Sequence, residues 1–470
     1  MARELQRVVA VVGGGLAGIA AAVRLAAAGD RPVVIETRRK LGGRATSFVD
    51  PRSGAVLDNC QHVLMGCCTN LLDLYARLGV ADKIEWHRAI HWANPPAEPD
   101  RMRPGLLPAP GHYTGSFLRM RFLSMAEKAA IARAMWRLLR IGLHGRTAWR
   151  GRVFMEFLEE TRQPPRAIER FWSPVVVSAC NLPVERVAAD CAMQVFQEGF
   201  LGSRRAGAMG LAAVPLVELY DPAERLIAET GGEIRTGLSA KSLAYDGARI
   251  TGVVTDEGFV SASAVVSAVP PDRLDKLVSA PLRGADNRLE RLSAIEFSPI
   301  LGVHLFFEQR VLDLPHLVLT GRDTQWMFNK GIDPEGRQHL HAVISGADDW
   351  MALAEDAIVE RVMADLHACV PRSIGLAPVA FRAVKEKRAT FAALPGVERL
   401  RPSAEPGTLG LRGGGVRNLF LAGDWCDTGW PATMEGAVRS GYAAASAFLG
   451  AGGPVPDLPV SRFSRLLGLR

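Results

Sequence analysis

The sequence has 470 residues, 48% of them hydrophobic, with a net charge of +7 and an isoelectric point near 9.2. This length and apolar content exceed one ordinary hydrophobic core, which predicts two domains and excludes a disordered protein. Seven cysteines without a CxxC spacing argue against a disulfide framework and a zinc site and fit a reducing cytosol. The lack of an apolar run of about 18 residues predicts a soluble protein.

The first elements follow the order of a dinucleotide-binding unit. An apolar, β-rich run at residues 8–12 leads into three glycines with the spacing GxGxxG and a helical segment, and a second apolar run at residues 33–35 ends at Glu36. Strand, glycine turn, helix, strand and acidic residue, in this order, are typical of a Rossmann-type βαβ unit. We therefore expect a nucleotide such as FAD or NAD, with Glu36 on its ribose hydroxyls.

Each residue of the glycine turn has a predicted task. Gly13 permits the tight turn, Gly15 lets the backbone approach a pyrophosphate, and Gly18 lets the helix pack against the strand. The helix begins at Leu16 and Ala17, and its free N–H groups and positive dipole end point at the phosphates.

A second glycine-rich loop, at residues 41–47, supports the same prediction. Gly42 and Gly43 precede Arg44, which suits a loop that wraps the pyrophosphate and directs a guanidinium fork at it. A glycine-rich surface turn without a ligand is the alternative interpretation.

The next segments change character. Residues 95–110 are rich in proline and are expected to form a loop or lid. Residues 116–200 have a mostly helical pattern, in which Ser124 and Glu127 have the spacing of a capping box.

The helix after this capping box has a basic face. Arg133, Arg137 and Arg140 follow one another at i, i+4 and i+7. This face fits an anionic membrane surface and fits the solvated side of an ordinary amphipathic helix equally well. Nucleic-acid binding is not predicted, because no aromatic residues interleave with the basic ones.

Short strands dominate the middle of the chain. Residues 232–235, 250–254 and 264–269 alternate with turn residues and predict a meander. His87 and His91 are four residues apart but have no carboxylate or cysteine motif beside them, so no metal site is predicted. Three further strands and a helix are expected at residues 301–307, 325–328, 339–344 and about 350–370.

The end of the chain returns to the opening pattern. An apolar run at residues 419–422, the Gly423-Asp424 turn and a helix from Met434 to about residue 449 predict that the chain re-enters its first domain. The predicted parts are 1–90, 206–272 and 411–450 for the nucleotide-binding domain, 91–205 for a mainly helical part facing substrate or membrane, 273–410 for the sheet and helices of the substrate domain, and 451–470 for a linker and basic tail.

Taken together, these segments resemble the flavin-containing amine oxidase and phytoene desaturase superfamily over nearly the whole chain. The resemblance implies an α/β fold with a Rossmann-type FAD-binding domain built from both chain ends and an interleaved α+β substrate-binding domain. The implied cofactor is FAD.

The resemblance also implies where FAD binds. Gly43 and Arg44 would hold the pyrophosphate, Asp424 the ribityl and pyrophosphate region, and Ala240 would touch adenine. The N–H of Met434, at the start of the last helix, would lie near the flavin pyrimidine ring. The implied cofactor site consists of Gly13, Gly15, Leu16, Ala17, Gly18, Glu36, Thr37, Arg38, Gly42, Gly43, Arg44, Ala240, Gly423, Asp424, Thr433 and Met434.

Four segments resemble one branch, the squalene-associated FAD-dependent enzymes, which are hydroxysqualene dehydroxylases of hopanoid biosynthesis. They are residues 57–70, 170–174, 178–181 and 325–328. The chain departs from the branch at Cys60, where many relatives have glycine, and at Cys180, where leucine is usual.

The branch implies reductive removal of an allylic hydroxyl from hydroxysqualene to give squalene, with a hydride from reduced FAD and an electron donor that the sequence does not name. Loss of water from an allylic alcohol is helped by a proton donor and requires that bulk water be excluded. Eighteen phenylalanines against five tyrosines suit an apolar tunnel for such an isoprenoid chain.

His62 is the predicted catalytic residue, as a proton donor beside the flavin, because imidazole titrates near neutral pH. The alternative is a structural histidine that holds the backbone near FAD. Asp58 and Asp427 are weaker candidates and fit turn or capping positions.

Three other functions stay open. A carotenoid desaturase would run hydride transfer in the opposite direction. An amine oxidase would need an aromatic cage that this tyrosine-poor sequence does not indicate. A flavin-binding scaffold at the membrane would have no turnover at all.

Overall fold

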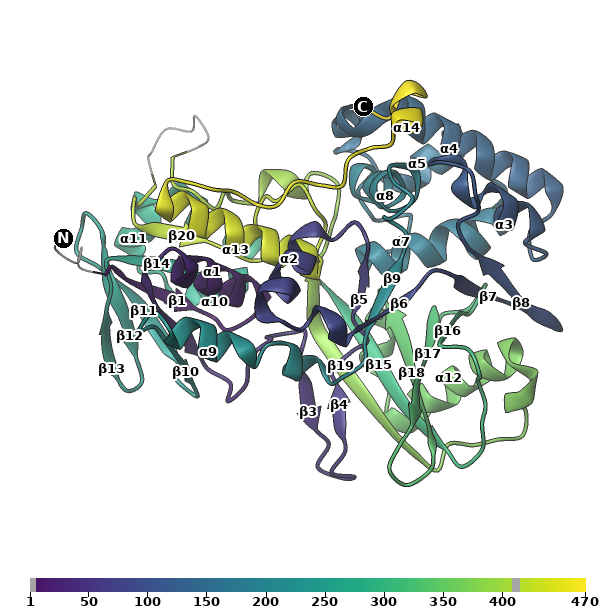
Figure 1. The fold of residues 1–470 in the computed structure, drawn as a ribbon, viewed down its shortest axis with the longest axis horizontal. Coiled ribbons are helices and arrows are strands. Elements are labelled where there is room, and N and C mark those ends of the chain that lie inside the picture. The colour runs from purple at the N-terminus through teal and green to yellow at the C-terminus, as the bar shows by residue number, and fades with distance from the viewer. Residues whose placement is uncertain (1–5, 408–414) are drawn as a thin grey trace.

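The computed structural model describes residues 6–407 and 415–470, which form two lobes (Figure 1). One lobe is built on a five-stranded sheet in the order β10-β2-β1-β14-β20, in which all neighbours pair in parallel. Its strands are β1 (Val8–Val12), β2 (Arg31–Glu36), β10 (Glu233–Thr236), β14 (Ala264–Ser267) and β20 (Leu419–Leu421). The predicted return of the chain end to the first domain is confirmed. The predicted limit between residues 410 and 411 lies outside the described residues.

Two helices from opposite ends of the chain cover one face of this sheet. Helix α1 (Leu16–Ala27) and helix α13 (Met434–Leu449) lie side by side (Figure 1). Their backbones approach closely at Gly441, where a Cβ atom would lie only 2.2 Å from the carbonyl oxygen of Ala17. Small residues therefore bring the two helices together. Both helices begin beyond the carboxyl ends of the parallel strands.

The predicted meander is partly wrong. The segments at residues 232–235 and 264–269 form β10 and β14 of the parallel sheet, and only the segment at 250–254 belongs to a separate antiparallel sheet. Short apolar runs fit a buried parallel strand and a meander equally well, so their periodicity could not separate the two. The antiparallel sheet consists of β11 (Ala240–Tyr245), β12 (Ile250–Thr255) and β13 (Gly258–Ser261).

The second lobe contains a seven-stranded sheet in the order β19-β15-β18-β17-β16-β7-β8. Its strands are β7 (Ile90–Asn94), β8 (Ala97–Met102), β15 (Phe297–Phe307), β16 (His316–Val318), β17 (Trp326–Ile332), β18 (Gln338–Ser345) and β19 (Ala380–Phe391). Helix α12 (Glu355–Cys369) packs on one face, where Leu301, Val303 and Leu305 of β15 are buried. Since side chains alternate along a strand, the side chain of Ile300 points to the opposite face, where it lines the cavity.

The prediction of a loop or lid at residues 95–110 is wrong in its first half. Residues 97–102 form β8, which pairs with β7 at the edge of the seven-stranded sheet. Pro99 is tolerated there because an edge strand leaves one row of N–H groups without a neighbour. Pro95 and Pro96 lie in the turn between the two strands.

A helical layer lies beside the second sheet. It contains α3 (Thr114–Arg119), α4 (Met125–Gly145), α5 (Phe154–Glu160), α6 (Pro165–Ala167), α7 (Ser173–Cys180) and α8 (Ala189–Phe196). The predicted capping box is confirmed, with Ser124 and Glu127 each bonding to the other's backbone. Along the described chain, no helix combines the length and the apolar character needed to cross a bilayer.

The remaining elements connect the lobes and the ends of the chain. They are α2 (Thr69–Leu78), α9 (Pro222–Ala228), α10 (Pro271–Leu277), α11 (Ala280–Ala285), α14 (Arg462–Leu466), β3 (Ser47–Val49), β4 (Val56–Asp58), β5 (Val63–Met65), β6 (Ile84–His87) and β9 (Met209–Ala212). All seven cysteines are free and buried.

Candidate functional site

One cavity of about 860 Å³ runs between the two lobes. A volume of this size falls in the range of cofactor and ligand sites. Of the seventeen residues predicted to act in the site, all but Gly18 line this cavity. Gly18 is instead a packing residue, since a Cβ atom there would lie 1.9 Å from the carbonyl oxygen of Gly13.

The N-terminus of α1 opens into the cavity and fits a pyrophosphate. Gly15 is the N-cap residue and has no side chain that could satisfy the first N–H groups of the helix. A Cβ atom on Gly15 would meet only the Cα of Gly43, at 3.8 Å. The free N–H groups and the positive end of the helix dipole therefore face open space, as an anionic phosphate group requires.

Glu36 ends β2 at the rim of the same space. One carboxylate oxygen accepts a hydrogen bond from the N–H of Gly14 at 2.7 Å, and the other accepts from the N–H of Arg38 at 2.8 Å. These bonds hold the carboxylate in place, and each oxygen keeps a lone pair for a ribose hydroxyl. The residues present fit the ADP part of FAD.

An ion pair links the second glycine loop to the late Gly-Asp turn. Arg44 donates to Asp424 at 2.5 Å and to the carbonyl of Ala389 at 2.8 Å. Gly423 has a φ of +144°, and its N–H donates to the hydroxyl of Ser440 on α13 at 2.7 Å. Two segments far apart in sequence thus form one wall of the cavity, as the resemblance implies.

The N-terminus of α13 forms the next part of the wall. Thr433 caps the helix by accepting from the N–H of Gly436 at 3.0 Å. Glu435, which is fully buried, caps a second helix, α2, because it accepts from the N–H of Leu71 at 2.8 Å and from the side chain of Asn70 at 2.8 Å. The role of Glu435 is not predictable from the sequence, since a carboxylate in the first turn of a helix predicts a cap for its own helix only.

The other end of the cavity is apolar. It is lined by Ile90, Trp92, Val175, Ala179, Val195, Phe200, Ile300, Trp326, Phe328 and Val343. The seven-stranded sheet and helices α7 and α8 supply most of these side chains, so this wall suits a long hydrocarbon.

Two of the segments that resemble the squalene branch, 178–181 and 325–328, meet at this end. Trp326 of β17 donates its indole N–H to Ser178 of α7 at 2.6 Å. Asn181, which ends α7 with a φ of +55°, donates to the hydroxyl of Thr390 at 2.9 Å and accepts from the N–H of Gly346 at 2.7 Å. Residues that lie more than a hundred positions apart therefore build one pocket.

His62 lines the cavity between its two ends. Its Nδ1 donates to the carbonyl oxygen of Cys60 at 3.0 Å, which leaves Nε2 of the neutral ring as an acceptor. Burial lowers the pKa of His62. With Nδ1 donating to Cys60, only the protonated ring can donate from Nε2, so the neutral form that burial favours can only accept a hydrogen bond there.

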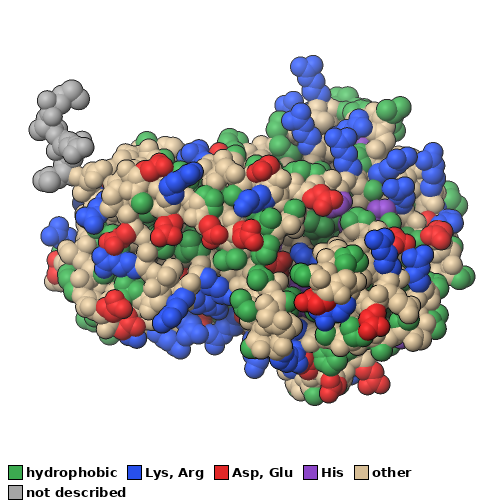
Figure 2. Space-filling model, turned by 60° about the horizontal axis from the view of Figure 1, so that its bottom comes forward, with side chains coloured by type: hydrophobic (Ala, Val, Ile, Leu, Met, Phe, Trp, Pro, Cys, Tyr) green, Lys and Arg blue, Asp and Glu red, His purple; other side chains and the backbone are tan. Residues whose placement is uncertain are grey.

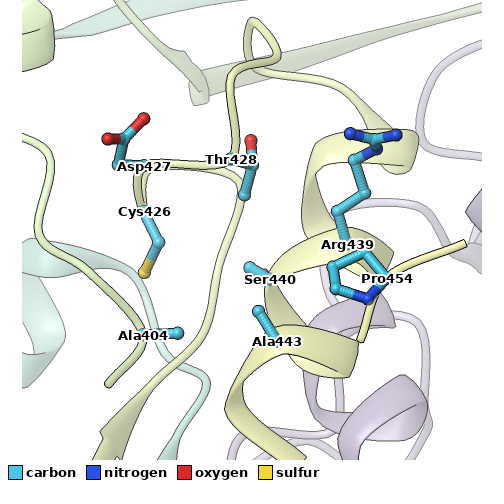
Figure 3. Close-up of a pocket in the computed structure, with 8 residues that line it drawn as sticks. All are labelled: Ala404, Cys426, Asp427, Thr428, Arg439, Ser440, Ala443 and Pro454. Atoms are coloured by element: carbon cyan, nitrogen blue, oxygen red, sulfur yellow. The ribbon is translucent and has the colours of Figure 1, made fainter. Parts of the chain in front are cut away.

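A second cavity, of about 150 Å³, lies behind the Gly-Asp turn. Figure 3 shows it between the turn at Cys426, Asp427 and Thr428 and the side chains of Arg439 and Ser440 on α13. It is too small for a nucleotide or an isoprenoid. The structure holds no group of three or more potential metal ligands within its described ranges.

The model of the family described as "Flavin containing amine oxidoreductase" matches residues 16–449. This match begins at α1 and takes in the later strands of the parallel sheet, the seven-stranded sheet, the helical layer and α13. A hydroxysqualene dehydroxylase from Rhodopseudomonas palustris is 28% identical over 466 residues, covering 95% of this chain and 100% of the relative. A 15-cis-phytoene desaturase from Synechococcus elongatus is 26% identical over 465 residues, covering 94% of this chain and 95% of the relative.

A solved structure has the same fold. A putrescine oxidase variant superimposes with a TM-score of 0.71 at 18% identity, covering 95% of this chain and 99% of that one.

Proposed function

This chain belongs to the family of flavin-containing amine oxidoreductases, and from this premise we propose that it removes the hydroxyl of hydroxysqualene reductively to give squalene. It is an FAD-dependent oxidoreductase with a mixed α/β fold. The observation that carries the proposal is that three of the four squalene-branch segments, 57–70, 178–181 and 325–328, line the same cavity as the predicted flavin site, and that Trp326 and Ser178 from two of them are hydrogen-bonded at its apolar end.

The residues of the chain divide the work between the two ends of the cavity. The N-termini of α1 and α13, with Glu36, Arg44 and Asp424, hold the cofactor. When bound, FAD supplies hydride chemistry at its ring. The apolar walls bind the hydrocarbon at about 0.8 kcal/mol for each buried CH₂ group, and they exclude the water that would capture a carbocation. His62 offers Nε2 to the substrate hydroxyl and so positions it.

Carotenoid desaturation is the second candidate, because the phytoene desaturase from Synechococcus elongatus covers as much of the chain at 26% identity. Its substrate is also a long isoprenoid, and the same apolar walls would hold it. Amine oxidation has less support, since among the described residues no tyrosine lines the cavity.

We also propose that the protein rests on an anionic membrane, from which an apolar substrate enters. Its surface has the exposed side chains of Leu106, Leu118 and Leu466, which are 97%, 51% and 74% exposed. Ser461, which caps α14, donates to the carbonyl of Ala109 at 2.7 Å, so the loop before α3 and the chain end form one surface.

Basic side chains surround these apolar ones. Arg119, Arg121, Arg462 and Arg465 are exposed on or beside α3 and α14. On the face of the molecule that Figure 2 shows, Lys and Arg side chains are interspersed with hydrophobic ones in the right-hand part. Apolar side chains ringed by cations bind the interface of anionic lipids. The predicted basic face of α4 contributes less, because Arg133 turns back to donate to the carbonyl of Thr161 at 3.1 Å.

A half-reaction tests the proposed activity. The flavin-loaded protein is reduced chemically without oxygen and mixed with hydroxysqualene, and the absorbance of oxidised flavin is followed. Substrate-dependent return of that absorbance is expected. A spectrum that stays reduced, with phytoene instead reducing the oxidised protein, would support the desaturase.

A further inference from the structure

Two buried hydroxyl groups line the large cavity without donating a hydrogen bond to the protein. Ser345, at the end of β18, and Thr390, near the end of β19, are only 6% and 8% exposed. Thr390 accepts from Nδ2 of Asn181 at 2.9 Å. Within residues 6–407 and 415–470, no group accepts a hydrogen bond from either O–H. A hydroxyl offers one donor and two lone pairs, so both O–H groups are left to donate into the cavity.

Asn181 holds these two residues in place. Its buried side-chain amide lies between them, because it donates to Thr390 and accepts at 2.7 Å from the N–H of Gly346, the residue after Ser345. Its backbone carbonyl accepts from the hydroxyl of Ser298 at 2.7 Å. The end of α7 is therefore bonded to three strands of the seven-stranded sheet, and the two hydroxyls have fixed positions beside it.

Thr390 is fastened to the predicted cofactor wall. The carbonyl of Ala389, the residue before it, accepts from Arg44 at 2.8 Å. Arg44 also pairs with Asp424, and these two residues are expected at the pyrophosphate and the ribityl chain of FAD. Thr390 is therefore one residue away from the wall that would carry the flavin.

Ser345 lies near the segment that carries His62. It pairs with Ile300 on the neighbouring strand β15. Two residues further along this strand, or about 7 Å, a Cβ atom on Gly302 would lie 3.6 Å from the Cα of Cys60. The carbonyl of Cys60 accepts from His62. The two hydroxyls, the His62 segment and the predicted flavin site therefore surround the same part of the cavity.

Unused hydroxyls in such a wall distinguish between ligands. A hydrocarbon that fills the cavity displaces water from both O–H groups and gives them no acceptor, which is unfavourable. An alcohol presents an oxygen with two lone pairs and accepts from them. The apolar side chains around the pair bind the rest of either ligand equally well. The hydroxyls therefore favour a ligand with an oxygen in its chain.

We propose that Ser345 and Thr390 select an oxygenated isoprenoid over a hydrocarbon by donating hydrogen bonds to the oxygen of the substrate. This rests on the proposed dehydroxylation and gives it a substrate class, an isoprenoid alcohol. The proton of the alcohol stays available to Nε2 of neutral His62. Squalene has no oxygen, so the same two hydroxyls weaken the binding of the product and favour its release.

Gln194 of α8 is the other buried side chain to compare. It lines the cavity, is 5% exposed, and its amide has no partner in the described parts of the chain. Glu198, four residues later, pairs with Arg146 at 3.2 Å, and charged groups retain water beside them. The Gln194 amide therefore keeps water as a partner when a hydrocarbon fills the apolar part of the cavity.

Binding to the oxidised, FAD-loaded, full-length protein tests the proposal without turnover. Hydroxysqualene and squalene have the same carbon skeleton and differ in the hydroxyl. The absorbance of the oxidised flavin reports the binding of each at one fixed detergent concentration. We expect the wild type to bind the alcohol at least about tenfold more tightly than the hydrocarbon.

Removal of either hydroxyl should reduce this preference. Thr390→Val keeps the shape of the side chain, and Ser345→Ala loses one atom. In each variant, the affinity for hydroxysqualene should fall about two- to tenfold. The affinity for squalene should stay or rise, since one hydroxyl fewer is left without an acceptor. Thr390→Ser keeps the hydroxyl and should retain the preference.

Ser298→Ala is the matched control. Ser298 lies opposite Thr390 in the sheet and is buried, but its hydroxyl donates to Asn181 and does not line the cavity. The ratio of the two affinities should therefore equal that of the wild type.

Three results would overturn the selection by this pair: no preference in the wild type, equal losses for both ligands in Thr390→Val and Ser345→Ala, or a preference that only Gln194→Leu removes. The proposed dehydroxylation fails separately. A reduced protein that prefers the alcohol through these hydroxyls but forms no squalene would overturn the reaction and support the selection.

Discussion

The indole N–H of Trp326 donates to the hydroxyl of Ser178 over 2.6 Å, which ties the seven-stranded sheet to α7 at the apolar end of the cavity. Ser178 in turn donates to the carbonyl of Pro174 one turn earlier in its helix. Two of the squalene-branch segments are therefore joined by a direct side-chain contact.

Loss of this contact should weaken the fold. Ser178→Ala leaves the partly buried indole N–H without its acceptor, and we expect the free energy of unfolding to drop by about 1–3 kcal/mol. Trp326→Phe removes the donor, so adding Ser178→Ala to it should cost much less. Urea unfolding of the two single variants and the double variant measures the coupling. If the losses of the two single variants simply add up in the double variant, the hydrogen bond contributes nothing to the free energy of unfolding.

A side chain at Gly15 should block the cofactor without disturbing the fold. The backbone there, with a φ of −76°, accepts alanine, but its Cβ atom would project where the pyrophosphate binds. We expect Gly15→Ala to weaken FAD binding by about 1–3 kcal/mol, or about five- to 150-fold in Kd. Titration of the apoprotein with FAD, with thermal unfolding as a check, measures this. Gly115→Ala is the control, because a Cβ atom there would have no neighbouring atom within 4 Å. Equal FAD affinities of the Gly15→Ala variant and the wild type would contradict the placement of the pyrophosphate at Gly15.

Acid should destabilise the protein through its buried histidines. His304 lies in the interior face of the sheet, where burial lowers its pKa to about 4. Between pH 6.5 and that value, the unfolded chain takes up a proton that the folded protein excludes, so stability falls as the pH falls. His304→Gln lacks this group and should lose about 2 kcal/mol less than the wild type between neutral pH and about pH 5. Urea unfolding of both proteins at both pH values measures this difference in stability loss. Equal losses of stability in the wild type and in His304→Gln would contradict the lowered pKa of His304.

The exposed apolar side chains beside α14 should anchor the protein to lipid. Replacement of Leu106 and Leu466 by serine should weaken binding to phosphatidylglycerol vesicles at least about tenfold, because each leucine loses about 1.5–3 kcal/mol of burial. Binding of the wild type should also weaken with added salt. Vesicle flotation measures both effects. Val49→Ser with Val56→Ser, on the exposed β3–β4 hairpin, is the control, and an equal loss there would contradict the assigned surface.

Residues at the cofactor end of the cavity could be predicted from the sequence, because this end is formed by backbone turns that require glycine at fixed positions. Glycines at fixed spacing and an acidic residue after β2 have few other structural solutions, and Gly13, Gly15 and Glu36 all line the cavity. The start of α13 at Met434 was also predicted correctly.

The substrate end was harder, because its residues meet only through tertiary packing. Nothing near Glu198 in the sequence indicates that the π-helical turn Gln197–Leu201, which the Gln197 side chain anchors to α4, places it in the cavity wall. The same holds for Glu435, which caps a helix about 365 positions away in the chain. Pro99 misled the prediction, since the rule against proline in strands does not apply at a sheet edge.

The most direct test of the proposed function is product analysis. The flavin-loaded, chemically reduced protein is incubated with hydroxysqualene, and the oxidised protein with phytoene, both without oxygen, and the products are identified by mass spectrometry. We expect squalene from the first reaction and unchanged phytoene in the second. New double bonds in phytoene, with no squalene formed from hydroxysqualene, would contradict it.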